Sequence, residues 1–110
     1  MTPDNPYAPY LAMTSQGYRM LEGMRQRARE GVVPEPAELK EARRRAHANV
    51  QALAAFLGIE RDDQAETAVD QAGLEAYEQA MGLCMDLTRF SLDLTRTYGP
   101  AYLVLPGDVE

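Results

Sequence analysis

The stretch from Asp63 to Tyr98 limits what this chain can fold into more than any other feature. It holds 36 residues without a proline. Asp63 and Glu66 form a capping-box pattern at its start, and Gly99 followed by Pro100 is a typical stop signal. We therefore predict one helix over residues 63–98, which would hold a third of the chain and be roughly 52 Å long.

Two shorter helices are predicted before it, over residues 9–30 and 36–57. Pro9 and Pro36 suit the first turn of a helix, because the missing N–H is not needed there. Gly31 and Gly58 suit helix ends, since glycine readily adopts the left-handed conformation. Each helix has an apolar stripe: Tyr7, Leu11, Thr14, Tyr18, Leu21 and Ala28 in the first, and Leu39, Ala42, Ala46, Val50, Leu53 and Leu57 in the second.

The fold class follows from these patterns. Strand-like alternation is missing, and 110 residues suffice for one domain with a modest core. We predict a single all-α domain over residues 1–110, a three-helix bundle with a long C-terminal helix. An extended arm covers residues 1–8 and holds Pro3 and Pro6, and a short apolar tail covers residues 99–110. Its run from Tyr102 to Leu105 is expected to dock on the bundle or to pair with a partner.

The predicted third helix is longer than the two helices that must cover it, which reach roughly 33 Å each. Either it bends at Gly73 or Gly82, so that the bundle has four elements, or the excess is covered by the tail or another chain. It has two apolar faces: a seam of Val69, Gly73, Ala76, Ala80, Leu83, Leu87, Phe90 and Leu94, and a second face of Leu74, Tyr77, Met81, Met85 and Leu92.

Polar residues are few in the second half of this helix. Asp86, Arg89, Asp93 and Arg96 alternate in sign at helical spacing, which predicts a solvated stripe paired with itself. The rest of the circumference is apolar, which is typical of a helix at the centre of a bundle or at a subunit interface. We therefore expect a homodimer, with two-fold symmetry as the first choice.

The formal net charge of −6 is unevenly distributed. Residues 1–59 carry a net charge of +2 and residues 60–110 a net charge of −8. One interpretation is internal pairing between basic faces of the first two helices and the acidic third helix. The other is an acidic surface around Asp63, Glu66 and Asp70 that binds a basic partner or imitates nucleic acid.

Composition narrows the cellular setting. No window is apolar enough to span a membrane, and residues 1–13 lack the basic start and apolar core of a signal peptide. The single cysteine, Cys84, excludes an internal disulfide framework. We therefore expect a cytoplasmic protein that does not enter a membrane.

Residues for catalysis or metal binding do not form a recognisable set. The only histidine is His47, with Arg44 rather than glutamate three residues before it, and Cys84 stands between apolar neighbours. We therefore predict no catalytic residue, metal or cofactor. Two glutamate pairs have metal-ligand spacing but lie among polar neighbours: Glu38 with Glu41, and Glu75 with Glu78.

Direct binding of nucleic acid is not expected either. The segment around Gly58 superficially resembles a helix-turn-helix. However, the start of the following helix holds Asp62, Asp63 and Glu66, which phosphates repel.

A surface for a protein partner is the better-supported prediction, since tyrosine and methionine are favoured at interfaces. We expect a non-enzymatic regulator, adaptor or assembly subunit that forms a homodimer through the third helix. One alternative is an acidic inhibitor that blocks a partner's nucleic-acid-binding site, as phage-encoded antagonists of host defence can do. Another is a metal-dependent helical enzyme. The candidate partner-binding residues are Tyr7, Tyr10, Met13, Met20, Met24, Met81, Met85, Leu92, Tyr102 and Leu103.

Overall fold

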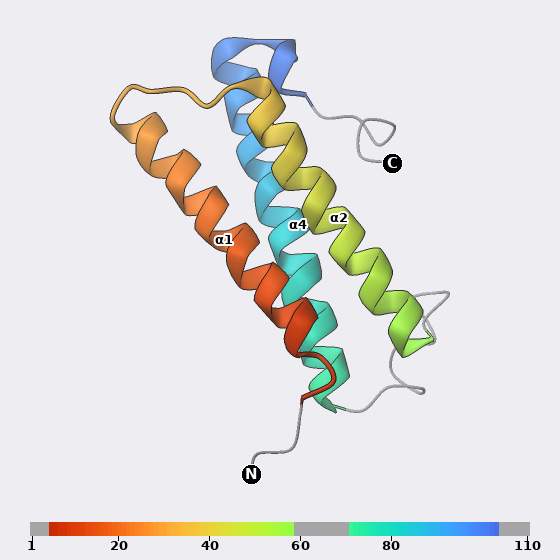
Figure 1. Cartoon of the computed structure of the whole chain (residues 1–110). Coiled ribbons are helices and arrows are strands. Elements are labelled where there is room, and N and C mark those ends of the chain that lie inside the picture. The colour runs from red at the N-terminus through yellow and green to blue at the C-terminus, as the bar shows by residue number, and fades with distance from the viewer. Residues whose placement is uncertain (1–4, 59–70, 104–110) are drawn as a thin grey trace.

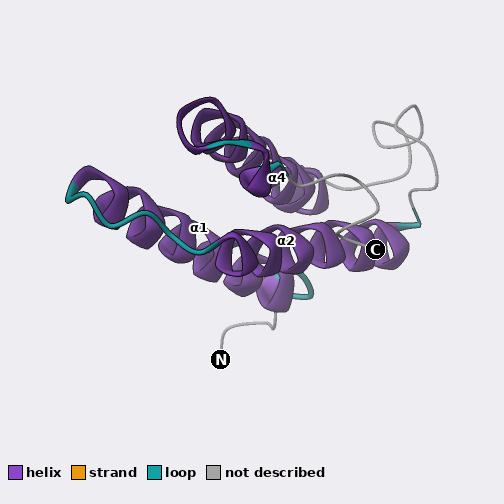
Figure 2. Cartoon of the chain, turned by 90° about the horizontal axis from the view of Figure 1, so that it is seen from above, coloured by secondary structure: helices purple, strands orange, loops and turns teal. Residues whose placement is uncertain are grey.

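The computed structural model describes residues 5–58 and 71–103. Its helices are α1 (Ala8–Arg29), α2 (Pro36–Leu57) and α4 (Gln71–Tyr98), followed by a short 3-10 turn, η2 (Pro100–Tyr102) (Figure 1). The three long helices pack on one another, and α4 lies on one side of the layer that α1 and α2 form (Figure 2). The predicted all-α three-helix bundle is confirmed, and the described part contains no strand.

Proline and glycine set the helix ends. Pro9 lies in the first turn of α1, and Pro36 is the first residue of α2. Gly58 ends α2 with φ of +74°, in the left-handed region that glycine tolerates best. Gly99 follows α4 with φ of +107°. The predicted start of the third helix at Asp63 lies outside the described residues.

The core is built on the predicted seam of α4. From Gly73 to Leu94 every described residue of that seam is buried, and Val69 lies outside the described residues. Leu21 and Met24 of α1 pack against it with no exposed area. The other buried apolar residues of the two facing helices are Leu39, Ala42, Ala46 and Leu53 of α2.

A glycine allows α1 and α4 to approach closely. A Cβ atom built on Gly17 of α1 would lie 2.3 Å from Cδ2 of Leu83 on α4, far inside van der Waals contact. Any other residue at this position would have to displace the Leu83 side chain, which is only 1% exposed. Gly17 therefore sets the distance between these two helices.

Of the alternatives that the sequence left open for the third helix, the described residues show the continuous one. Helix α4 is one uninterrupted helix of 28 residues through both Gly73 and Gly82. Gly82 instead makes room for a neighbour, since a Cβ there would lie 3.3 Å from the Tyr18 hydroxyl. The small residues thus serve close packing rather than bending.

The tail turns back onto the bundle through Tyr102. The Ser91 hydroxyl of α4 donates to the Tyr102 carbonyl, and the Tyr102 hydroxyl donates to the Pro34 carbonyl at 2.9 Å. Pro34 lies in the connection between α1 and α2, so one side chain ties the end of α4 to that connection. Residues 104 and 105 of the apolar run lie outside the described residues.

Residues 5–7 do not form the free extended arm that the prolines predicted. The Asn5 side chain accepts a hydrogen bond from the Tyr7 N–H at 2.9 Å, which makes a turn into α1. The Tyr7 ring is buried and meets the Phe56 ring edge-on, with 5.9 Å between centroids. Tyr7 therefore joins the start of α1 to the end of α2.

Charged side chains pair mainly within their own helix. On α4, Arg89 pairs with Asp86 at 3.8 Å and Arg96 with Asp93 at 3.6 Å, which confirms the predicted self-paired stripe. Arg27 of α1 pairs with Glu38 of α2. Between described residues, no ion pair joins α4 to α1 or α2. Charge pairing therefore does not hold the described part of α4 in place, whereas apolar burial does.

Two leucine-to-alanine substitutions test this account of the core. Leu87→Ala should lower the free energy of unfolding by about 2–5 kcal/mol, because Leu87 is fully buried and its loss leaves a cavity. Leu103→Ala, at an exposed leucine, should change it by less than about 1 kcal/mol. Urea unfolding followed by circular dichroism measures both, and equal effects would contradict the assignment of the core.

Candidate functional site

The outer face of α4 carries an uncovered apolar stripe. Met81, Met85 and Leu92 are exposed, and Leu74 on the same face is half-buried. Met85 stands midway between the buried Leu83 and Leu87, about 200° of helix rotation from each, so it points away from the core. We refer to Leu74, Met81, Met85 and Leu92 as the α4 stripe.

The two edges of the α4 stripe differ in charge. At 100° per residue, Glu78, Arg89 and Arg96 fall along one edge, and Tyr77, Thr88 and Thr95 along the other. The uncharged edge faces α2, because the Arg43 guanidinium of α2 donates to the Thr88 hydroxyl at 3.0 Å. The charged edge therefore lies on the side away from α2.

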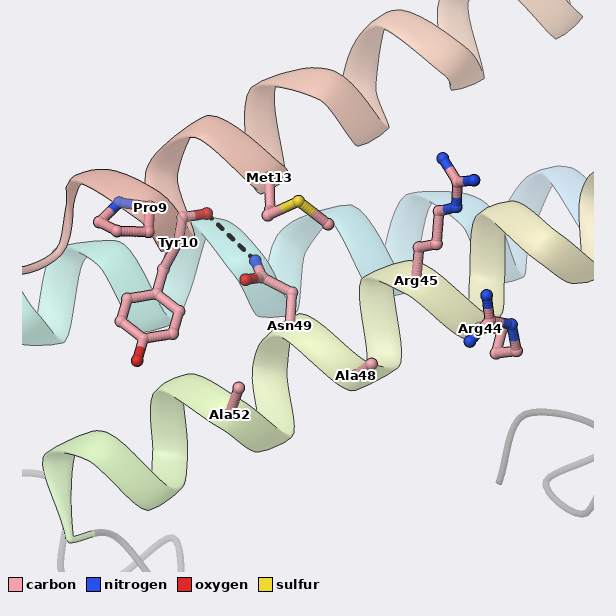
Figure 3. Close-up of a pocket in the computed structure, with 8 residues that line it drawn as sticks. All are labelled: Pro9, Tyr10, Met13, Arg44, Arg45, Ala48, Asn49 and Ala52. Atoms are coloured by element: carbon pink, nitrogen blue, oxygen red, sulfur yellow. Dashed lines mark hydrogen bonds between the residues drawn. The ribbon is translucent and has the colours of Figure 1, made fainter.

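A second apolar surface is the groove between α1 and α2 (Figure 3). Its volume is about 390 Å³. Pro9, Tyr10 and Met13 of α1 form one wall, and Ala48 and Ala52 of α2 form the other. We refer to this surface as the α1–α2 groove.

Asn49 lies buried in the α1–α2 groove and ties its two walls together. Its side-chain amide donates to the Tyr10 carbonyl and to the Thr14 hydroxyl, both at 3.1 Å. The Thr14 hydroxyl in turn donates to the Tyr10 carbonyl at 3.0 Å. All these polar atoms are satisfied, so the groove has a fixed floor.

Arginines stand at one end of the groove and aromatic rings at the other. Arg44 and Arg45 both donate to Glu41, and these hydrogen bonds lower the pKa of the Glu41 carboxyl to about 2. At the other end, the Tyr10 and Phe56 ring centroids are 5.6 Å apart. Phe56 is about half exposed, so it extends the apolar surface beyond the groove.

The predicted partner-binding residues separate into core and surface. Met24 has no exposed area and Tyr7 is buried, so both belong to the monomer core rather than to a binding surface. Met20 is half-buried against the core, and Tyr102 is held by the bundle itself. The remaining ones stand on three surfaces: Tyr10 and Met13 in the groove, Met81, Met85 and Leu92 on the α4 stripe, and Leu103 after η2.

The acidic candidates Asp63, Glu66 and Asp70 lie outside the described residues. The structure adds residues that the patterns did not single out, namely Asn49 in the groove and the exposed Phe56 and Val32. Asn49 has a signal in retrospect, because it stands on the apolar stripe of its helix between Ala46 and Leu53, where an amide needs a partner.

The side chains of Cys84, His47 and Arg43 line one small cavity of about 40 Å³ between α2 and α4. Cys84 is far from Arg43 and His47 in the sequence, so the sequence did not predict that these three side chains are neighbours. Burial raises the pKa of the Cys84 thiol, although the nearby Arg43 acts in the opposite direction. The thiol therefore stays protonated at neutral pH and is not an activated nucleophile.

Metal ligands do not gather in the part of the chain that the structure describes, where no three of its histidine, cysteine, aspartate and glutamate side chains lie together as a metal site requires. The described helices also lack the combination of length and apolar character that a membrane span needs. The chain matches no protein-family model, no curated protein and no solved structure.

Alkylation tests the inertness of Cys84. At pH 7 the native protein should react with iodoacetamide at least about tenfold more slowly than the urea-unfolded protein, because burial keeps the thiol protonated and shielded. The rate should rise as the pH is raised past the ordinary thiol range, since only the thiolate reacts. Mass spectrometry of timed samples measures it.

A matched control places a thiol on the surface. The Ser15→Cys variant in a Cys84→Ala background should react at the rate of an unfolded thiol, since Ser15 is exposed on α1. Equal rates for the native Cys84 thiol and this surface thiol would show that Cys84 is accessible and reactive after all.

Proposed function

We propose that this chain is a non-enzymatic, cytoplasmic interaction subunit, acting as a regulator, adaptor or assembly component, that forms a homodimer through α4. The observation that carries the proposal is the α4 stripe. It places two methionines and a leucine, all exposed, in line on the face of α4 opposite its buried seam. A line of exposed apolar residues on one helix face favours an interaction site.

The residues around the stripe support binding over catalysis. Thioether and isobutyl groups bury area and supply no proton or nucleophile. Four charged groups of α4 are paired with one another along the helix: Asp86 with Arg89, and Asp93 with Arg96. The nearest thiol, Cys84, is held protonated by burial. The α1–α2 groove offers a second apolar surface for a different protein partner.

The cytoplasmic setting rests on the free thiol, because an unpaired cysteine is usual in a reducing compartment. The metal-dependent alternative lacks the support of a ligand cluster among the described residues.

Light scattering coupled to size exclusion tests the dimer. The native protein should have about twice the monomer mass of 12.2 kDa. Met85→Glu should give the monomer mass with an unchanged circular dichroism spectrum. Met85 is 54% exposed, so a charge there would disrupt the dimer contact and leave the fold of the monomer intact. Leu83 is unsuitable for this test because it is buried in the core.

Val32→Glu is the matched control. Val32 is 55% exposed in the connection between α1 and α2, so it presents a similar apolar surface away from α4. This variant should remain dimeric. A native protein of 12.2 kDa up to millimolar concentration, or equal dissociation by both variants, would overturn the proposed interface.

A second function has a specific observation in its favour. The ion pairs of α1 and α2 between described residues join arginines to glutamates of these same two helices. None of these pairs joins an arginine to an acidic residue of α4. The excess negative charge of residues 60–110 is therefore not offset by those pairs. This supports the alternative of an acidic inhibitor that occupies the nucleic-acid-binding site of a basic protein.

The triple variant Asp63→Asn, Glu66→Gln, Asp70→Asn tests this alternative. Immobilised native protein should retain basic nucleic-acid-binding proteins eluted from heparin, and added DNA should displace them. The triple variant should retain at least about tenfold less, because the attraction is electrostatic. Capture that persists in about 1 M salt, where the screening length is near 3 Å, would contradict the alternative.

A further inference from the structure

We infer that two copies of this chain pack the outer faces of their α4 helices antiparallel, about a two-fold axis that is level with residue 83 along the helix. This inference rests on the proposed homodimer. In this arrangement Leu74 of each copy lies against Leu92 of the other, and Met81 of each copy lies against Met85 of the other. The partner for the α4 stripe is thus a second copy, in one defined orientation and register.

The spacing of the α4 stripe is the first argument. Leu74 and Leu92 stand nine residues on either side of Leu83, and Met81 and Met85 stand two residues on either side. A two-fold axis perpendicular to the helix at that point therefore exchanges the members of each pair. All four apolar residues then meet an apolar residue, whereas a shift by one heptad would place Met85 against Thr88 and leave Leu74 opposite Gly99.

The orientation follows from the unlike edges of the stripe. In an antiparallel pair related by a two-fold axis, each edge of one helix faces the same edge of its mate. In a parallel pair each edge faces the opposite one. The parallel arrangement would set Glu78 and Arg89 against the uncharged edge with Tyr77 and Thr88, and would leave both charges without a mate.

Antiparallel packing brings opposite charges together instead. Glu78 stands five residues before Leu83 and Arg89 six residues after it, on the same edge. Each Glu78 therefore comes beside Arg89 of the second copy, and the two-fold axis makes this pair twice. Charge complementarity of this kind selects one orientation over another.

The two groups are free to form this contact. Glu78 is exposed and forms no ion pair with another described residue. Arg89 is 72% exposed, and its contact with Asp86 is long at 3.8 Å. Asp86 also accepts a hydrogen bond from the Tyr18 hydroxyl at 3.3 Å. The Arg89 guanidinium can therefore turn to Glu78 of the second copy while Asp86 keeps that partner.

Disulfide trapping tests the orientation in a Cys84→Ala background. Purified Leu74→Cys and Leu92→Cys chains, distinguished by mass tags, are mixed, allowed to exchange subunits and oxidised. The expected product is the mixed disulfide between the two variants. Neither variant should cross-link to itself, because like positions lie 18 residues apart along the helices, or about 27 Å, while a disulfide spans about 4.4–6.8 Å between Cα atoms.

Charge reversal tests the register. Glu78→Arg and Arg89→Glu should each weaken the dimer about tenfold, because each places like charges face to face twice. The double variant should recover most of the native affinity, which sedimentation equilibrium measures. The matched controls are Glu75→Arg on α4 and Arg19→Glu on α1, which make the same charge changes away from the stripe and should have little effect.

The outcomes separate this inference from the proposed function. A native dimer that Met85→Glu dissociates, but in which Leu92→Cys cross-links readily to itself, would show parallel packing and overturn the inference alone. Equal losses in the two single variants with no recovery in the double variant would overturn the register. A native protein that is monomeric would overturn the inference together with the proposed homodimer.

Discussion

The apolar seam of α4 has to be covered by two helices at once, and this requirement sets the positions of α1 and α2. The seam meets different neighbours along its length. Ala76 and Ala80 pack in one cluster with Tyr7 and Leu53, and the larger residues from Leu83 to Leu94 pack in another with Leu21, Met24 and Leu39. Gly17 lets α1 come close enough for Leu83 to fill the space between the helices. Tyr102 then joins the far end of α4 to the connection between α1 and α2. Each of these contacts depends on the seam being in place.

Covering one face of α4 leaves the opposite face to solvent or to a partner. On α1 and α2, Arg25, Arg27, Arg44 and Arg45 pair with glutamates of the same two helices. On α4, Met81, Met85 and Leu92 are exposed on the face opposite the buried seam, with charged residues along one edge. This exposed apolar line is the reason why α4 is proposed as the contact in self-association.

Helical periodicity and the proline and glycine positions were sufficient to predict the fold class and the seam. They could not predict Gly17, since a glycine in a helix has no period and its reason lies on another helix. The same limit applies to the cavity that Arg43, His47 and Cys84 share. For Met24 the pattern was ambiguous, because a methionine beside the stripe can face either the core or a partner. Whether the third helix bends also depended on packing, since Gly82 accommodates Tyr18 instead of breaking the helix.

Asn49 has a consequence for how the α1–α2 groove meets a ligand. Its buried side-chain N–H groups donate to the Tyr10 carbonyl and the Thr14 hydroxyl. If α2 slid along α1 by one turn, these N–H groups would lose both acceptors, at a cost of about 1–3 kcal/mol. The two walls are therefore locked in one relative position in the free protein. A molecule that binds there meets a surface already in its final shape, and little free energy is lost to ordering the receptor. The groove would select ligands by fit rather than adapt to them.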